Sequence, residues 1–149
     1  MMFKEDIEVG IVNSFDCASI KKCAEIIELE RNYGEKSNLP DETRPFVCVG
    51  KCNDRSQWAE ITKEKAKHRL EIKLGWRSWQ DGDQNHDKTV GWKSRSQYIN
   101  GAVFEGPNEQ WAQFATDNNT QGRFKIVTTE GIEAIKKKLT PELKVPLFD

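Results

Sequence analysis

The chain has 149 residues, 36% hydrophobic and 32% charged, and its 23 basic and 24 acidic residues leave a formal net charge of -1. These values predict one folded domain with a polar surface and exclude a disordered chain. The balanced charge also excludes a generically basic nucleic-acid binder, so any contact with nucleic acid must use a local patch.

The chain carries no sign of export or of a membrane segment. No apolar run is long enough for a membrane span, and Glu5, Asp6 and Glu8 stand where a signal peptide would be apolar. The four cysteines are Cys17, Cys23, Cys48 and Cys52. Their spacing matches no Cys-x-x-Cys motif, so we expect a cytoplasmic protein with reduced thiols and with neither a metal site nor a cofactor.

The first third of the chain predicts a strand, a helix and a second strand. Residues 7–13 alternate between apolar and polar, and Asp16 is a suitable N-cap for a helix over 17–32 that ends near Gly34. A polar loop follows. Arg44 and Pro45 then open an apolar strand over 46–50, where proline is acceptable because the first position needs no ladder donor.

The middle of the chain predicts further strands. Residues 57–62 form a strand candidate joined to the previous one by a turn over 51–56, and 69–74 alternate as a strand. The polar run 80–89 is long enough to be a functional loop. Residues 97–104 are another strand candidate.

The last third of the chain predicts both helix and strand. Residues 109–116 fit a helix or a strand, 123–127 fit a strand, and Thr128 or Thr129 caps a helix that ends at Leu139. This order predicts a single α+β domain over 1–149. It would be a small, strongly bent antiparallel sheet or open barrel, with an early helix and a C-terminal helix against it.

Arg44, Thr62 and Lys63 are the first candidate site. If strands 46–50 and 57–62 form a hairpin, these residues lie near the same end of the sheet and offer a guanidinium, a hydroxyl and an ammonium to an anion. The alternative is that Arg44 pairs with a nearby acid such as Glu42 and that Thr62 only ends a strand.

The segments ETRPFVCVG (42–50) and QWAEIT (57–62) resemble the opening of the MazF/PemK and ToxN-like endoribonuclease toxins. In those families a basic residue precedes an apolar strand, and the next strand ends on a threonine. RFKIV (123–127) and the helix after it resemble the closing strand and helix. Lys63 departs from the family pattern, which has serine, and Glu60 stands where many members carry proline.

The resemblance implies a MazF/CcdB-like fold and cleavage of single-stranded RNA without metal, through attack by the ribose 2′-hydroxyl. It implies catalytic roles for Arg44 and Thr62, with Lys63 as a substitute for the serine. The early helix is more similar to the ToxN/CptN branch, whose antitoxin is a repeated RNA, than to the MazF branch, whose antitoxin is a protein. We therefore expect RNA as substrate and as antitoxin, with a higher-order protein–RNA assembly possible.

Aromatic and basic residues interleave in the middle of the chain, which suits single-stranded RNA because bases stack on rings while cations meet phosphates. The candidates for RNA binding are Lys65, Lys67, Arg69, Arg77, Trp79, Trp92, Lys93, Arg95, Ser96 and Asn100. The alternative places the tryptophans in the core. We expect Trp58 in the core and Trp79 and Trp92 exposed beside the polar loop.

The two histidines, His68 and His86, leave other functions open. His68 lies between Lys67 and Arg69 and is the better candidate for a general base. The run DGDQNHD (81–87) lacks the glycine and glutamate positions of a calcium loop. Three functions remain: an RNA-cleaving toxin, a non-catalytic RNA- or protein-binding module, and a small-substrate enzyme that uses His68.

Overall fold

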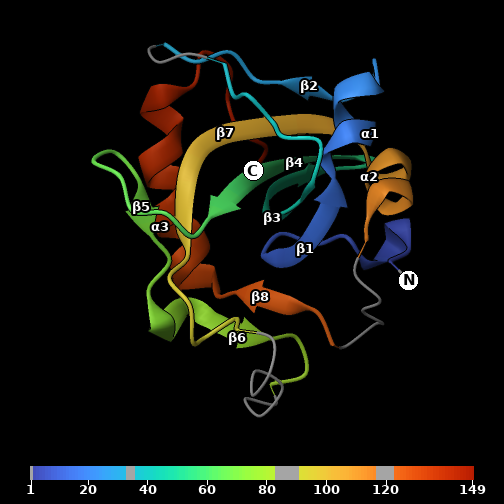
Figure 1. Cartoon of the computed structure of the whole chain (residues 1–149). Helices are drawn as coiled ribbons and strands as arrows, with labels where there is room; N and C mark the ends of the chain where they lie inside the picture. Colours follow the sequence, from blue (N-terminus) through green and yellow to red (C-terminus); the bar gives the residue numbers. More distant parts are fainter. Residues whose placement is uncertain (1, 33–35, 83–90, 117–122) are drawn as a thin grey trace.

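The computed structural model of the chain describes residues 2–32, 36–82, 91–116 and 123–149. It is an α+β domain built on an open antiparallel sheet in which β7 bends strongly around the centre (Figure 1). The strands are β1 (Ile11–Asp16), β2 (Ile27–Glu28), β3 (Thr43–Cys52), β4 (Arg55–Thr62), β5 (Leu70–Glu71), β6 (Arg77–Trp79), β7 (Tyr98–Pro107) and β8 (Lys125–Val127). The α-helices are α1 (Cys17–Lys22), α2 (Asn108–Phe114) and α3 (Thr129–Leu139), and none of the helices described is long and apolar enough to cross a membrane.

The strand order is β2-β7-β4-β3-β1-β8-β6, with β5 pairing with β7 outside this path. Short 3-10 turns cover Lys4–Asp6, Leu74–Trp76 and Thr140–Glu142. The predicted class and the antiparallel sheet are confirmed.

Alternation along the strands gives the sheet two buried faces. In β3, Val47 and Val49 enter a cluster that includes Ile135 and Leu139 of α3. The intervening Phe46 and Cys48 enter a second cluster on the opposite face. The second cluster is aromatic, and Phe15 meets Trp58 edge-on at 4.8 Å between centroids.

The early helix is much shorter than predicted. Asp16 is its N-cap as expected, since its Oδ1 accepts a hydrogen bond from the Ala18 N–H at 3.2 Å. However, α1 ends at Lys22, and Ile27–Glu28 forms β2 against β7. Pairing with β7 overrides the helical spacing of the apolar residues after Lys22. Gly34, the predicted helix end, lies outside the described residues.

Two strand boundaries also differ from the prediction. Strand β3 already begins at Thr43, and Pro45 lies inside it, paired with Ser14 of β1. The ladder with β4 begins only at Phe46, so Pro45 interrupts no pairing on that side. Only Leu70–Glu71 is strand in the predicted stretch 69–74, because a 3-10 turn starts at Leu74.

The ends of the chain follow the prediction more closely. Gly10, at φ 100°, precedes β1, so the strand starts at Ile11 rather than at residue 7. The stretch 109–116, predicted as helix or strand, is mostly helix, since α2 covers Asn108–Phe114 and Ala115 forms a bridge with Phe15. The C-terminal helix begins at the predicted place, where the Thr128 hydroxyl accepts a hydrogen bond from the Gly131 N–H at 3.3 Å.

A β-bulge in β7 shapes one place on the sheet. Ala59 pairs with Val103 and Ile61 with Ile99, so three residues of β7 stand opposite the single residue Glu60 of β4. Gly101, the middle of the three, has φ 95°, which a residue with a Cβ rarely adopts. Such bulges commonly redirect a side chain next to a functional site.

Candidate functional site

Two adjoining cavities lie beside this bulge, with volumes of about 550 Å³ and 260 Å³. They share three lining residues, Arg31, Arg69 and Asn100, and we call them together the Glu60 groove. The other lining residues are Ser37, Asn38, Glu60, Ala66, Lys67, His68, Ala102, Lys138 and Glu142. The groove therefore joins one buried carboxylate to a histidine and several cations.

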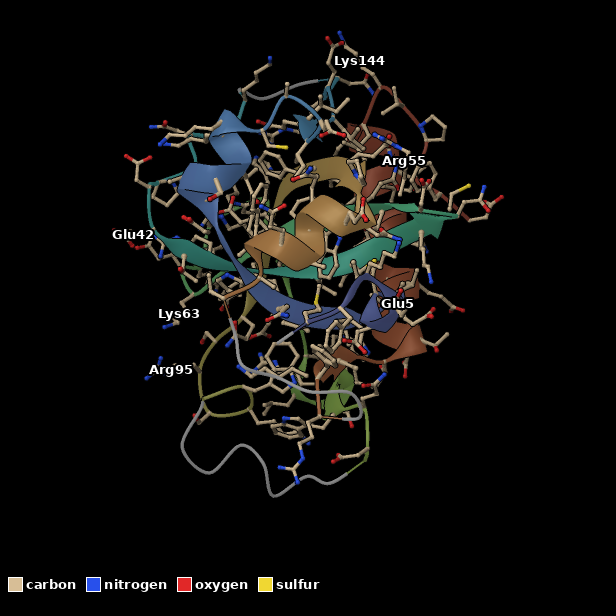
Figure 2. All side chains as sticks on the ribbon, turned by 90° about the vertical axis from the view of Figure 1, so that its right-hand side faces the viewer. Glu5, Glu42, Arg55, Lys63, Arg95 and Lys144 are labelled. Atoms are coloured by element: carbon tan, nitrogen blue, oxygen red, sulfur yellow. The ribbon has the colours of Figure 1, made fainter. Side chains whose placement is uncertain are left out.

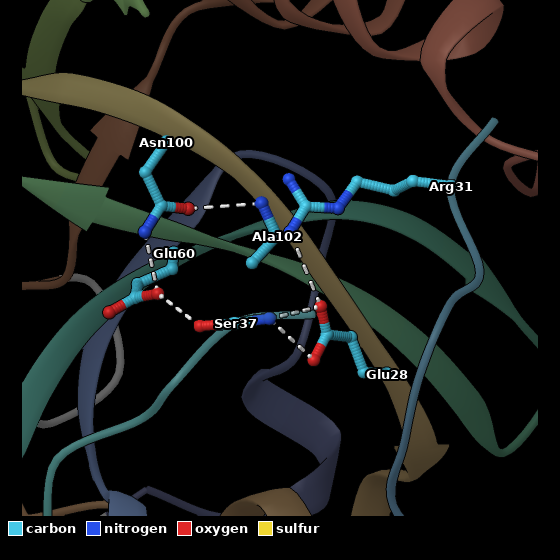
Figure 3. A network of polar contacts seen from close by, with 6 residues as sticks. All are labelled: Glu28, Arg31, Ser37, Glu60, Asn100 and Ala102. Atoms are coloured by element: carbon cyan, nitrogen blue, oxygen red, sulfur yellow. Dashed lines mark hydrogen bonds and ion pairs between the residues drawn. The ribbon is translucent and has the colours of Figure 1, made fainter. Parts of the chain in front are cut away.

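Glu60 is the most constrained charged group of the groove. Its side chain projects from β4 onto the face that carries Trp58, and the residue is 6% exposed. Its Oε1 accepts hydrogen bonds from Asn100 Nδ2 at 2.7 Å and from Ser37 Oγ at 3.4 Å (Figure 3). Within the described residues Oε2 has no hydrogen-bond partner, which leaves one oxygen of a fixed carboxylate for a ligand.

Asn100 is oriented by the bulge. Its Oδ1 accepts a hydrogen bond from the Ala102 N–H at 3.0 Å, which leaves its Nδ2 to donate to Glu60 (Figure 3). The two contacts distinguish the oxygen from the nitrogen of the amide. The bulge thus determines how the carboxylate of Glu60 is held.

The cations of the groove are partly neutralised. Arg31 lies 3.6 Å from a Glu28 oxygen, and the Glu28 carboxylate also accepts the Ser37 N–H at 2.8 Å and 3.1 Å (Figure 3). A Cβ on Gly101 would stand 3.3 Å from Arg31 Nη1, so the missing side chain lets the guanidinium lie close to β7. On the far wall Lys138 pairs with Glu142 at 2.6 Å.

Arg44 belongs to the same face as Glu60. It stands two residues before Phe46, which pairs with Glu60, and its guanidinium contacts Glu42 at 3.4 Å. Its side chain is 42% exposed, so this ion pair leaves it accessible. The ion pair with Glu42 is the alternative that the sequence left open.

The thiol of Cys17 reports the charges near Arg44. Its pKa is raised to about 11, mainly by burial and then by the charge of Glu60, while the charge of Arg44 lowers it. Both charged groups therefore act on the same thiol at the start of α1.

Arg44, Thr62 and Lys63 lie near the same end of the sheet, as the hairpin predicts, because Phe46 of β3 pairs with Glu60 of β4. None of the three is among the described lining residues of the Glu60 groove. The Thr62 hydroxyl accepts a hydrogen bond from the Glu64 N–H at 3.3 Å, as in a turn that ends a strand. Lys63 is exposed and lines a different cavity. Of the predicted RNA-binding residues, Lys67, Arg69 and Asn100 line the Glu60 groove, and Lys65 and Ser96 are exposed outside it.

The expectation that Trp79 and Trp92 are exposed is wrong. They are 3% and 2% exposed and belong to the cluster beneath α3. Trp92 Nε1 donates to the Ser78 carbonyl at 2.9 Å, and Trp79 lies in β6. Neither ring offers a face on which a base could stack, because both rings are buried in the core. Lys93 lies 6.0 Å above the Trp79 ring.

Arg77 is also buried and does not face a ligand. It is 3% exposed, and its guanidinium donates to the carbonyls of Ile72 at 2.8 Å, Trp92 at 3.2 Å and Arg95 at 2.7 Å. The predicted contact with RNA is replaced by hydrogen bonds to three backbone oxygens. Arg77 thereby holds the segment that follows residue 90.

A smaller cavity of about 180 Å³ lies between β1, β3 and the segment 91–97. We call it the cation cavity because three of its lining residues are Lys63, Arg95 and Lys125. Lys63 and Arg95 project from the same edge of the molecule (Figure 2). The predicted basic stretch is therefore divided between this cavity and the Glu60 groove.

Sequence reasoning missed Glu60 and Arg31 as site residues. For Glu60 a signal was available in the sequence, because it is an acid in an apolar strand. It stands two residues after Trp58 and therefore on the same inward face of that strand. Within the described residues no group of three or more His, Cys, Asp or Glu could hold a metal. His86 and most of the run 81–87 lie outside the described residues.

Comparisons of the chain with family models, with curated proteins and with solved structures gave no match.

Proposed function

We propose that the chain is a metal-independent endoribonuclease that cleaves single-stranded RNA in the Glu60 groove. The observation that carries the proposal is the buried carboxylate of Glu60, which Asn100 and Ser37 hold in place. One of its oxygens has no hydrogen-bond partner among the described residues and lies at the wall of a groove that contains arginines and a histidine.

The chemistry needs only these side chains. Glu60 Oε2 takes the proton of the ribose 2′-hydroxyl, and the 2′-oxygen attacks the adjacent phosphorus. The bond from phosphorus to the 5′-oxygen breaks, and His68 in its protonated form gives a proton to that oxygen. The products are a 2′,3′-cyclic phosphate and a 5′-hydroxyl.

Charge stabilisation comes from the arginines. Arg31 and Arg69 line both cavities of the groove, and a planar guanidinium can bind two phosphate oxygens at once. Arg44, on the same face of the sheet, adds a third positive charge. Such donors stabilise the phosphorane more than the substrate when they are held in place beforehand.

We further propose that the protein acts as a toxin held inactive by an RNA antitoxin. This part rests on the resemblance of residues 42–50 and 57–62 to the MazF/PemK and ToxN-like toxins. In this proposal the antitoxin RNA occupies the groove and competes with the substrate.

A cleavage assay on an unstructured, fluorescently labelled RNA in EDTA tests the proposal. Wild-type protein should release fragments with cyclic phosphate ends, and Glu60→Gln should cut about 10²–10⁴-fold more slowly while still binding RNA. Glutamine can still accept from Asn100, so the fold should persist. Glu64→Gln, an exposed acid four residues further on, is the matched control and should cut normally.

The other functions predict different outcomes. Saturable RNA binding by wild-type protein without cleavage would identify a binding module. Absence of both cleavage and binding would leave a small-substrate enzyme as the remaining candidate.

A further inference from the structure

The cation cavity differs from an ordinary basic surface because its cations have no acidic partners in the described part of the chain. Lys63, Arg95 and Lys125 line it from three separate segments, and none of them makes an ion pair with another described residue. Its other described lining residues are Val12, Ser14, Pro45, Gly91, Trp92 and Gln97, none of which is acidic. Three unneutralised cations around one concave space favour an anion.

The side-chain amide of Gln97 lines the same cavity and adds a hydrogen-bond donor to its cations. Gln97 is 7% exposed, and its side chain makes no hydrogen bond with any described residue. Because the amide has no partner among the described residues, its donor and acceptor atoms are available to a ligand. Gln97 lines the cavity, where a bound oxyanion would accept the hydrogen bond that its Nε2 can donate.

Backbone conformation and hydrogen bonds hold the walls of the cation cavity in place. Gly91 has φ 77°, and a Cβ there would stand 3.0 Å from Arg95 Nε, so glycine allows the arginine to fold back over the turn. The buried Arg77 binds the carbonyls of Trp92 and Arg95 and holds this turn from below. The opposite wall is rigid as well, because Ser14 and Pro45 are paired neighbours in β1 and β3.

We propose that the cation cavity is a binding site for the phosphate group of a nucleotide ligand, separate from the Glu60 groove. Lys63, Arg95 and Lys125 supply positive charge, and the Gln97 amide donates a directional hydrogen bond. The volume of about 180 Å³ suits a phosphate rather than a whole nucleotide. The buried Trp92 excludes recognition by stacking on its face, so the base is not read here.

Free nucleotides and an RNA backbone present the same chemistry, and one titration separates them. The isotope-labelled full chain is titrated with inorganic phosphate, with adenosine 5′-monophosphate and with a short RNA, each against sodium chloride at equal ionic strength. The signals to follow are the Trp92 indole N–H and the Gln97 side-chain amide. A site for free nucleotides should bind the monophosphate at least as tightly as the RNA, whereas a backbone site should bind the RNA at least tenfold more tightly.

Two variants test the residues. Lys125→Gln should weaken phosphate binding about tenfold, and Gln97→Met, which keeps the volume and removes the amide, should weaken it similarly. Lys137→Gln, on the exposed side of α3, is the matched control and should bind as wild type.

The proposal is overturned if none of the three ligands gives a saturable shift, or if Lys125→Gln binds phosphate as wild type does. The backbone spectrum of Gln97→Met shows whether that variant folds, and Lys125→Gln changes only a partly exposed side chain. The result does not depend on cleavage. Glu60→Gln should leave phosphate binding intact even if the protein cuts no RNA.

Discussion

The Glu60 groove and the cation cavity use the same basic residue types in opposite ways. In the groove Arg31 and Lys138 are held by Glu28 and Glu142, and a buried carboxylate is the central group. In the cavity the cations have no such partners among the described residues, and an amide is the central group. Partly neutralised charge around a fixed carboxylate suits proton transfer on a substrate that must leave, whereas cations without acidic partners among the described residues suit retention of an anion.

The largest expected effect comes from removing the support of the cation cavity. Arg77→Met should lower the free energy of unfolding by about 4 kcal/mol, because three carbonyls lose a charged donor inside the protein. Chemical denaturation measures the change. Arg95→Met removes a neighbouring arginine that is exposed, so its stability should stay within about 0.5 kcal/mol of wild type. Equal losses for the two variants would show that Arg77 does not anchor the turn.

The next effect should separate the two regions by activity. Arg44→Ala should reduce RNA cleavage about a hundredfold, because a charge that stabilises the phosphorane is lost. Arg44→Lys should recover only part of the rate, since an ammonium cannot reproduce the guanidinium fork. Lys125→Ala is the control from the cation cavity and should change the cleavage of a dinucleotide less than threefold. A normal rate for Arg44→Ala would remove Arg44 from the catalytic site.

A smaller effect concerns the salt dependence of RNA binding. If the RNA backbone occupies the cation cavity, Lys125→Gln should reduce the slope of log affinity against log salt concentration by about one. Glu60→Gln removes a negative charge and releases no counterion from RNA, so its slope should not fall. Filter binding or fluorescence anisotropy from low to moderate salt gives both slopes. Identical slopes for wild type and Lys125→Gln would place the RNA elsewhere.

The smallest expected effect uses Cys17 as a reporter of the Glu60 groove. Burial, and then the charge of Glu60, raises the pKa of its thiol to about 11, so Glu60→Gln should lower that pKa and speed alkylation a few-fold at pH 9. Arg44→Ala should slow it, because Arg44 lowers the same pKa.

Cys48 is the matched control for this reporter. Burial raises its pKa to about 12, and its neighbouring charges are Lys51, Glu8 and Lys136 rather than Glu60. Its alkylation, followed by mass spectrometry after Cys23 and Cys52 are replaced by serine, should not respond to Glu60→Gln. Unchanged alkylation of Cys17 in both Glu60→Gln and Arg44→Ala would contradict the shared environment of Glu60 and Arg44.

The sequence predicts those parts of the fold whose signals are local. The Asp16 and Thr128 caps and the β3–β4 hairpin follow from short motifs. The length of α1 does not, because pairing of β2 with the distant strand β7 decides it. The same limit applies to the sites. Glu60 depends on a bulge forty residues further along the chain, and the burial of Trp92 depends on packing under α3.

The position of β8 in the sheet implies that the Glu60 groove forms before the cation cavity during folding. Strand β1 pairs with β8, joining Ile11 to Ile126, whereas β1, β3, β4 and β7 are complete by residue 107. Contacts between residues so far apart in the chain form late, since closing a long loop costs entropy before any contact repays it. During synthesis the carboxylate of Glu60 can form its hydrogen bond with Asn100 before Lys125 has been translated. The cation cavity is therefore expected to form last, when the C-terminal third of the chain joins the sheet.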